Sequence, residues 1–299
     1  MATDTTVSSG ERTGRAALAA AAVTVLLWAS AFVAIRSAVH HYSPGALALG
    51  RLLAGSLTLG AILLVRREGL PPRAAWPGIA VTGVLWFGVY MVTLNWGELE
   101  VDAGTAAMVI NIGPLLIALF AGWILKEGFP KRLLFGMAVS FTGAAIVGIS
   151  TSENTGSSVL GVGLCVVAAV SWAAATLAQK PALRHASALQ VTTFGCAIGA
   201  VACLPFAGQL VSQAAAAPLS ATLDLLYLGV FPTALAFTTW AYALARTTAG
   251  ALGATTYIVP ALVVLMAWAV LGEVPAHLTF AGGALCLLGV AISRTRRRK

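Results

Sequence analysis

Charged residues are scarce in this sequence. Only 9% of its 299 residues are Asp, Glu, Lys or Arg, and ten residues are acidic. A soluble globular domain usually carries about 25% charged residues. Hydrophobic residues make up 59% of the chain, so its composition excludes an ordinary water-soluble domain and indicates a protein that lies in lipid.

Clustered metal ligands are also missing. The four cysteines lie inside apolar runs without C-x-x-C spacing, and the four histidines are scattered. Cysteines of this kind act as small, reduced, buried hydrophobic residues. The sequence therefore predicts no metal site and no cofactor. The residues concerned are Cys165, Cys196, Cys203, Cys286, His40, His41, His185 and His277.

The net charge of +8 does not indicate a nucleic-acid partner. The basic residues lie between apolar runs and in the tail at 294–299, where basic groups set topology and contact anionic lipid headgroups. The expected partners are therefore a lipid bilayer and a small-molecule substrate, and the chain is expected to be a monomer or a homodimer.

Ten apolar runs fill the chain, with Pro, Gly and charged residues between them. A helix of about 20 apolar residues crosses the hydrocarbon core, so the fold class is predicted as all-α integral membrane with ten transmembrane helices. The runs are 16–38, 44–65, 74–96, 102–124, 131–150, 158–179, 188–210, 220–243, 248–271 and 279–294.

The polar segment 1–15 is expected to be a disordered cytoplasmic N-terminus. The run that starts at Ala16 is longer than the apolar core of a signal peptide, about 7–15 residues, and is interpreted as the first span. With the N-terminus in the cytoplasm, every basic residue except Arg36 and Arg51 falls on the cytoplasmic side. Both termini, including the basic tail 295–299, are therefore expected to be cytoplasmic.

The chain contains an internal repeat. Ala103-Gly104, Pro114 and Glu127 recur as Ala249-Gly250, Pro260 and Glu273, at a constant offset of 146 residues. The offset continues to the pairs Gly136/Gly282 and Gly143/Gly289, and at 144 residues Trp28 matches Trp172 and Arg36 matches Lys180.

Each repeat, 16–150 and 158–294, contains five helices. Because five is odd, the two halves must cross the membrane in opposite orientations, which is the inverted-repeat plan of many secondary transporters. A central cavity is expected between the halves.

These motifs resemble the drug/metabolite transporter superfamily in its ten-helix EamA-type form. The resemblance rests on LLWASAFVAIRSA, on Pro44 to Arg51 as P-x6-R, on AGTAAMVINIGPLLIALFAGWILKE, and on their counterparts in the second half. It implies an exporter of amino acids or other small metabolites in a bacterial inner membrane. One branch of the superfamily, the YddG type, exports aromatic amino acids.

Polar and aromatic residues at mid-membrane depth are the candidate substrate-binding residues, because burying polar groups in lipid is costly. Asn111 and Tyr257 occupy equivalent places in the two repeats. Asn111 either lines the cavity or joins two helices by a hydrogen bond. The remaining substrate-binding candidates are Trp28, Trp86, Tyr90, Trp172, Thr176 and Trp240.

Pro114, Pro260, Gly104 and Gly250 are the candidate helix-break and gating residues, since proline removes a backbone donor; simple kinking is the alternative. Trp240 could instead be an interfacial anchor. Arg51 either extends to the outer headgroups or contacts a substrate carboxylate or a helix C-terminus. Glu127 and Glu273 are expected to tie a loop through an ion pair or a backbone hydrogen bond.

The function predicted from these features is export of small organic metabolites, above all neutral or aromatic amino acids, by alternating access. No acidic residue is expected at a span centre; Glu98, Glu100, Asp102 and Glu153 are assigned to loops, and Asp224 comes nearest to a span. The alternative is an integral-membrane enzyme that acts on lipid, but the sequence has no paired carboxylates, His cluster or catalytic triad for it. A scaffold subunit without a cavity is a third possibility.

Overall fold

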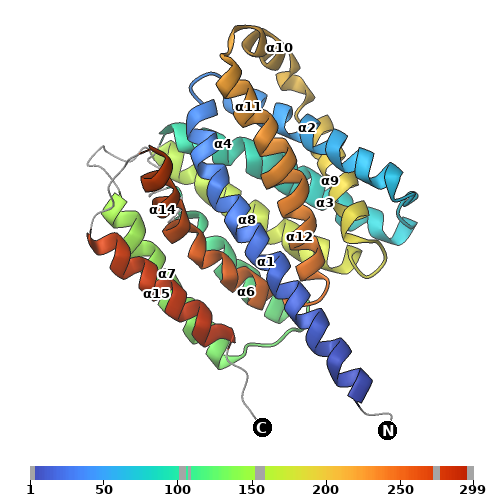
Figure 1. Cartoon of the computed structure of the whole chain (residues 1–299), viewed down its shortest axis with the longest axis vertical. Helices are drawn as coiled ribbons and strands as arrows, with labels where there is room; N and C mark the ends of the chain where they lie inside the picture. The colour runs from blue at the N-terminus through green and yellow to red at the C-terminus, as the bar shows by residue number, and fades with distance from the viewer. Residues whose placement is uncertain (1–3, 101–105, 107–108, 152–158, 272–276, 295–299) are drawn as a thin grey trace.

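The computed structural model describes residues 4–100, 106, 109–151, 159–271 and 277–294, and in these residues it contains helices and turns but no strand (Figure 1). Helices α1 and α15 place the two ends of the described chain at the same end of the molecule (Figure 1).

The first half of the chain begins with a long helix and ends with α7 at the edge of the bundle. Its elements are α1 (Asp4–Ala38), α2 (Pro44–Val65), η1 (Arg73–Ala75), α3 (Trp76–Thr82), η2 (Gly83–Tyr90), α4 (Met91–Glu100), α6 (Ile112–Ile124) and α7 (Lys131–Thr151).

The second half follows the same order of spans and contains further short elements, among them α10. Its elements are α8 (Val159–Ala182), α9 (Ala188–Ala202), η3 (Leu204–Phe206), α10 (Ala207–Ala216), α11 (Leu219–Leu228), η4 (Gly229–Leu235), α12 (Ala236–Leu244), α13 (Ala249–Gly253), η5 (Ala254–Ile258), α14 (Val259–Leu271) and α15 (His277–Arg294).

Ten helical runs can be traced through the described residues. Six are long and apolar enough to cross a membrane, and the bent pair α9 and α10 makes a seventh. The shorter apolar helices Ile112–Ile124 and Phe280–Ser293, together with α7, complete the ten. The chain is an all-helical, multi-pass membrane protein, as its sequence predicts.

Three boundaries differ from the prediction. Helix α1 begins at Asp4, so it includes most of the segment expected to be disordered. The run 188–210 ends early, because Pro205 follows Ala202 and the chain bends by 53° before α10. The assignment of Glu98 to a loop is wrong, since α4 continues to Glu100 and carries Glu98 in its last turns.

The two repeats meet along α7 and α15, which lie side by side (Figure 1). Ser140 and Cys286 are 146 residues apart, the repeat offset, and they bond reciprocally. The Ser140 hydroxyl donates to the Cys286 carbonyl at 3.1 Å, and the Cys286 thiol donates to the Ser140 carbonyl at 3.5 Å. Because the two equivalent residues make the same contact with each other, a local two-fold axis relates the two halves at this point.

Glycines allow this close approach. A Cβ atom on Gly136 would lie 2.5 Å from the Gly289 carbonyl oxygen, and one on Gly143 would lie 2.6 Å from that of Gly282. Small residues let helices pack closely in lipid, where apolar side chains gain nothing by leaving the hydrocarbon.

The third span of each repeat contains a π-helix. The first begins at Gly83 and the second at Gly229, again 146 residues apart. The second contains Pro232, which cannot donate to a regular helical ladder. π-Helical turns are rare and often occur at functional sites, and here they lie next to the centre of the molecule.

Candidate functional site

A cavity lies between the two halves of the chain. The cavity has a volume of about 70 Å³. This is room for a few water molecules, each of which needs about 10–15 Å³ by the same measure. Its walls come from both repeats and are mostly apolar. The lining residues are Trp28, Ala31, Phe32, Ile35, Arg51, Trp86, Tyr90, Met91, Leu94, Ile110, Asn111, Trp172, Phe237, Thr256, Val259 and Pro260.

Four tryptophans pack together beside the cavity, and three of them line it; we call the four the tryptophan cluster: Trp28, Trp86, Trp172 and Trp240. All six distances between their ring centroids fall between 5.0 and 6.3 Å. They come from α1, η2, α8 and α12, which belong to the first and third spans of the two repeats. Edge-to-face and offset contacts of this kind stabilise aromatic packing.

The indole N–H groups of the cluster are poorly satisfied. The Nε1 atoms of Trp28, Trp172 and Trp240 are buried and have no hydrogen-bond partner. Buried tryptophan N–H groups normally have one. Trp28 and Trp172 line the cavity, so two indole groups beside it have an N–H without a partner.

The ninth span changes geometry beside the cavity. It runs from α13 through the 3₁₀-helix η5 into α14, where Pro260 is the second residue. Because Pro260 has no N–H, the carbonyl of Thr256 one turn earlier loses its usual donor. Thr256 and Pro260 both line the cavity.

The fourth span shows a related interruption. Asn111 is not helical, and α6 begins at the next residue with Pro114 in its first turn. Asn111 is only 6% exposed and lines the cavity. Both candidate helix-breaking prolines therefore lie beside interruptions in their spans.

The structure brings five of the candidate binding residues to the cavity and leaves three away from it. Trp28, Trp86, Tyr90, Asn111 and Trp172 line it. Trp240 is fully buried behind Trp28, so it is not an interfacial anchor. Thr176 and Tyr257 are fully buried outside the lining, with hydroxyl groups that have no partner.

The position of Tyr257 differs from that of Asn111 although the two match in the repeat. Its ring packs against Phe141 at 6.4 Å, and the neighbouring Thr256 takes its place at the cavity. Gly104 lies outside the described residues. Pro114 and Gly250 are buried and do not line the cavity.

The structure resolves the two alternatives for Arg51. The side chain is 5% exposed and lines the cavity, and its Nε donates to Thr233 Oγ1 at 3.1 Å. It does not extend to the headgroups. Phe237 also lines the cavity and was not predicted, because one Phe in an apolar run carries no signal; its spacing of three residues from Trp240 was the one hint.

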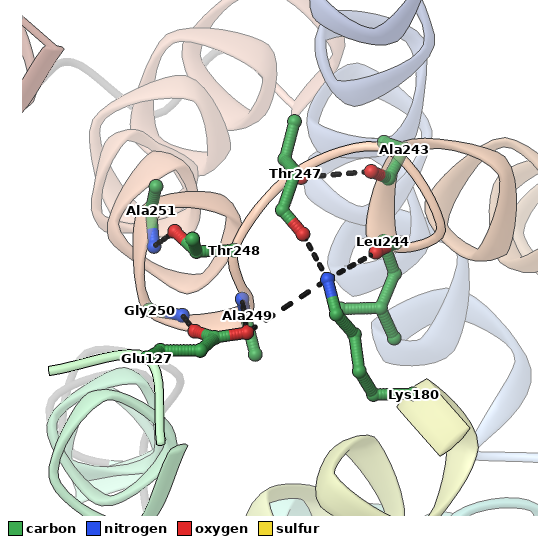
Figure 2. Close-up of polar contacts among 9 residues, drawn as sticks. All are labelled: Glu127, Lys180, Ala243, Leu244, Thr247, Thr248, Ala249, Gly250 and Ala251. Carbon is green, nitrogen blue, oxygen red and sulfur yellow. Dashed lines mark hydrogen bonds and ion pairs between the residues drawn. The ribbon is translucent and has the colours of Figure 1, made fainter. Parts of the chain in front are cut away.

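A polar network joins the halves at the end of α6. Glu127 accepts hydrogen bonds from the backbone N–H groups of Ala249 at 2.9 Å and Gly250 at 3.4 Å, and its carboxylate lies 3.8 Å from Lys180 Nζ. Figure 2 shows Lys180 reaching from α8 toward the turn between α12 and α13. There its ammonium donates to the carbonyls of Leu244, at 2.7 Å, and Thr247.

The expectation that Glu127 ties a loop is therefore confirmed, by an ion pair and by backbone hydrogen bonds. We call Glu127, Lys180 and the backbone of 244–250 the latch. Glu273, the repeat counterpart of Glu127, lies outside the described residues.

Ten helical runs in two related halves, with an apolar cavity between them, define the class of membrane transporters with inverted repeats. The chain belongs to the EamA-like transporter family, which it matches twice, over residues 15–149 and 159–295. The two matches coincide with the two repeats.

Several relatives are named as transporters. The chain is 37% identical to a "Probable terminal-alkyne amino-acid exporter" of Streptantibioticus cattleyicolor, over 92% of each chain. It is 30% identical to the uncharacterized transporter YdfC of Bacillus subtilis, over 91% of this chain and 89% of that one.

More distant matches extend this picture. A "Probable amino-acid metabolite efflux pump" of Salmonella typhimurium is 23% identical over 91% of this chain and 93% of its own. A solved crystal structure superposes with a TM-score of 0.77 at 23% identity, covering 95% of this chain and 99% of that one, which shows the fold. The chain is therefore a transporter of small metabolites.

Proposed function

We propose that this protein exports neutral α-amino acids with compact apolar or aromatic side chains by alternating access. The observation that carries the proposal is the cavity between the repeats, which has an aromatic wall and a few polar groups. Such a cavity suits an apolar side chain attached to a small polar head. The names of the relatives from Streptantibioticus and Salmonella support an amino-acid substrate.

The latch supports the alternating-access part of the proposal. It holds α6 of the first repeat against α8, α12 and α13 of the second. A network of one ion pair and several backbone hydrogen bonds can break and reform as a unit, as a two-state transition requires. Closure of the latch seals one end of the cavity, and its opening exposes that end.

A line of polar groups on α8 connects the cavity with the latch. Trp172, Thr176 and Gln179 are spaced i, i+4 and i+7 and share one face of the helix. The Thr176 hydroxyl and both side-chain polar atoms of Gln179 are buried without a partner. Unpaired groups of this kind are costly in a closed state, and water or substrate would satisfy them when the latch opens.

The latch end is the cytoplasmic end in this proposal. The basic residues Lys126, Lys180 and Arg246 lie around it, and basic residues concentrate on the cytoplasmic side of bacterial inner-membrane proteins. Both termini share that side. Substrate then enters from the cytoplasm through the α8 line and leaves on the opposite side.

The test is transport by the purified full-length protein in sealed proteoliposomes. Radiolabelled phenylalanine, leucine and norvaline should move down their gradients faster than in protein-free vesicles. Failure to move any of these three would overturn the amino-acid assignment. Equal rates with and without an imposed pH gradient would exclude proton coupling, whereas acceleration by the gradient would establish it.

A further inference from the structure

Two charged side chains lie within the membrane-spanning part of the molecule beside the cavity. The first, Arg51, lines the cavity directly. Within the described chain its guanidinium makes one hydrogen bond, from Nε to Thr233. A guanidinium has five N–H donors, so most of its donors are left for an occupant of the cavity.

The second is Glu98. Tyr90, Met91 and Leu94 line the cavity from η2 and α4, and Glu98 follows Met91 and Leu94 at i+7 and i+4, on the same face of the helix. Both carboxylate oxygens are buried and have no hydrogen-bond partner. A buried carboxylate without a donor costs several kcal/mol, on the order of a lost charged hydrogen bond or more, so this group needs a partner.

Arg51 and Glu98 are close enough to act electrostatically on each other, yet no hydrogen bond joins them. The other groups that interact with this pair are Arg36 of α1, Tyr90 of η2, Cys165 of α8 and Cys196 of α9. Arg36 is exposed at the end of α1. A positive and a negative group are thus held apart, with the cavity beside them.

The repeat shows that the fold does not require these charges. Helices α2 and α9 are equivalent in the two repeats, and their N-cap residues Ser43 and Ser187 are 144 residues apart. At this offset, Gly195 is the counterpart of Arg51. The π-helices correspond at 146, so Glu98 corresponds to Leu244. The second half builds the same spans with neither charge. Within the described residues, the cation that lines the cavity and the anion on the neighbouring helix face both come from the first half.

We propose that Arg51 and Glu98 bind the α-carboxylate and the α-ammonium of a zwitterionic amino acid, while the tryptophan cluster contacts its side chain. This assignment rests on the proposed function. A guanidinium recognises a carboxylate with two parallel N–H donors, and an ammonium donates three hydrogen bonds to acceptors.

The experiment compares three ligands that share one side chain. Phenylalanine has both charges, phenethylamine has the ammonium alone, and 3-phenylpropionate has the carboxylate alone; leucine, 3-methylbutylamine and 4-methylpentanoate form a second series. Inhibition of amino-acid uptake by each analogue is measured in proteoliposomes. The wild-type protein should prefer the zwitterion to either analogue by about 10-fold or more, the worth of one charged hydrogen bond.

Each substitution should remove one preference. Glu98→Gln should lower the preference over the carboxylate-only analogue by about 10-fold and keep the preference over the amine. Arg51→Gln should do the reverse. If a variant no longer transports, quenching of tryptophan fluorescence by the same ligands measures the preference as binding, because the cluster lies at the site.

Matched controls lie on the same helices. Glu100→Gln changes an exposed residue of α4, and Arg66→Gln changes the exposed residue that follows α2; both should keep the wild-type preferences. Variants that transport or bind with unchanged preferences would overturn the assignment while leaving amino-acid export intact. A wild-type protein that moves neither phenylalanine nor leucine would overturn both proposals.

Discussion

Trp28 and Trp172, which are equivalent residues of the two repeats, touch each other edge to face at the centre of the molecule, with ring centroids 6.1 Å apart and planes at 88°. Contact between equivalent residues means that the local two-fold relation passes between them, as it does between Ser140 and Cys286. The cavity wall is therefore built where the two repeats meet, and any rocking of one half against the other must move these two rings.

Trp172→Ala should lower transport by at least about 10-fold. Truncating a buried tryptophan also costs about 3–5 kcal/mol of stability, so Trp172→Phe is the informative partner: it keeps a six-membered ring and removes the five-membered ring of the indole with its N–H. We expect intermediate transport from Trp172→Phe, with a smaller loss of thermal stability than Trp172→Ala causes. Trp96→Ala, at a side chain that is 44% exposed, is the control and should transport normally.

Asn111→Ala separates the two roles considered for this residue. If Asn111 contacts substrate, transport should fall by about 10-fold while the melting temperature in detergent stays within a few degrees, since one neutral hydrogen bond contributes about 1 kcal/mol. A large loss of melting temperature with the remaining transport unchanged would show instead that Asn111 joins helices.

Glu127→Gln should weaken the latch. The amide keeps one acceptor for the Ala249 N–H but loses the charge that faces Lys180. A thiol placed at Gln179, which is fully buried, should then react faster with a water-soluble maleimide than the same thiol behind an intact latch. The comparison uses Gln179→Cys with and without Glu127→Gln.

The native cysteines Cys165, Cys196, Cys203 and Cys286 are all buried, and the Glu127→Gln protein without the new thiol measures their background. Equal labelling rates with and without Glu127→Gln would show that the latch does not close this route.

Gly289→Ala should destabilise the seam between α7 and α15. A Cβ at this position would lie 2.4 Å from the Gly136 carbonyl oxygen and 2.2 Å from Ser140 Oγ, so the helices must separate. Overpacking of this kind costs about 1–3 kcal/mol, which a thermal melt in detergent will detect. Gly163→Ala, on α8 with no atom within 4 Å of its new Cβ, should show no loss.

The repeat could be recognised before the structure because rare residues preserve its register. Pro114 with Pro260 and Glu127 with Glu273 keep one offset in a chain whose other residues are mostly apolar. Trp28 and Trp172 match at a second offset of 144 residues and lie near the centres of their apolar runs, so they could be placed beside the cavity. Phe237 could not, because nothing distinguishes one apolar residue from its neighbours until the packing is known.

Glu98 shows why the charged part of the site could not be predicted. Glu98, Glu100 and Asp102 come shortly after the apolar run 74–96. Such a cluster of acidic residues is typical of a loop. The π-helix of η2 and the continuation of α4 extend the span to Glu100, and this extra helix turns Glu98 inward.

The sequence alone determined that this chain lies in a membrane and that its helices form two inverted sets of five. It also predicted that aromatic residues line a cavity between the two sets. These follow from local chemistry, because apolar length and repeat register are properties of the chain alone. Tertiary structure decided which polar groups come together at the cavity and at the latch: Arg51 turned inward, Glu98 carried into the span, Tyr257 displaced by Thr256, and Lys180 joined to Glu127. Each depends on where helices distant in sequence pack, and burial makes the pairing of polar groups decisive there.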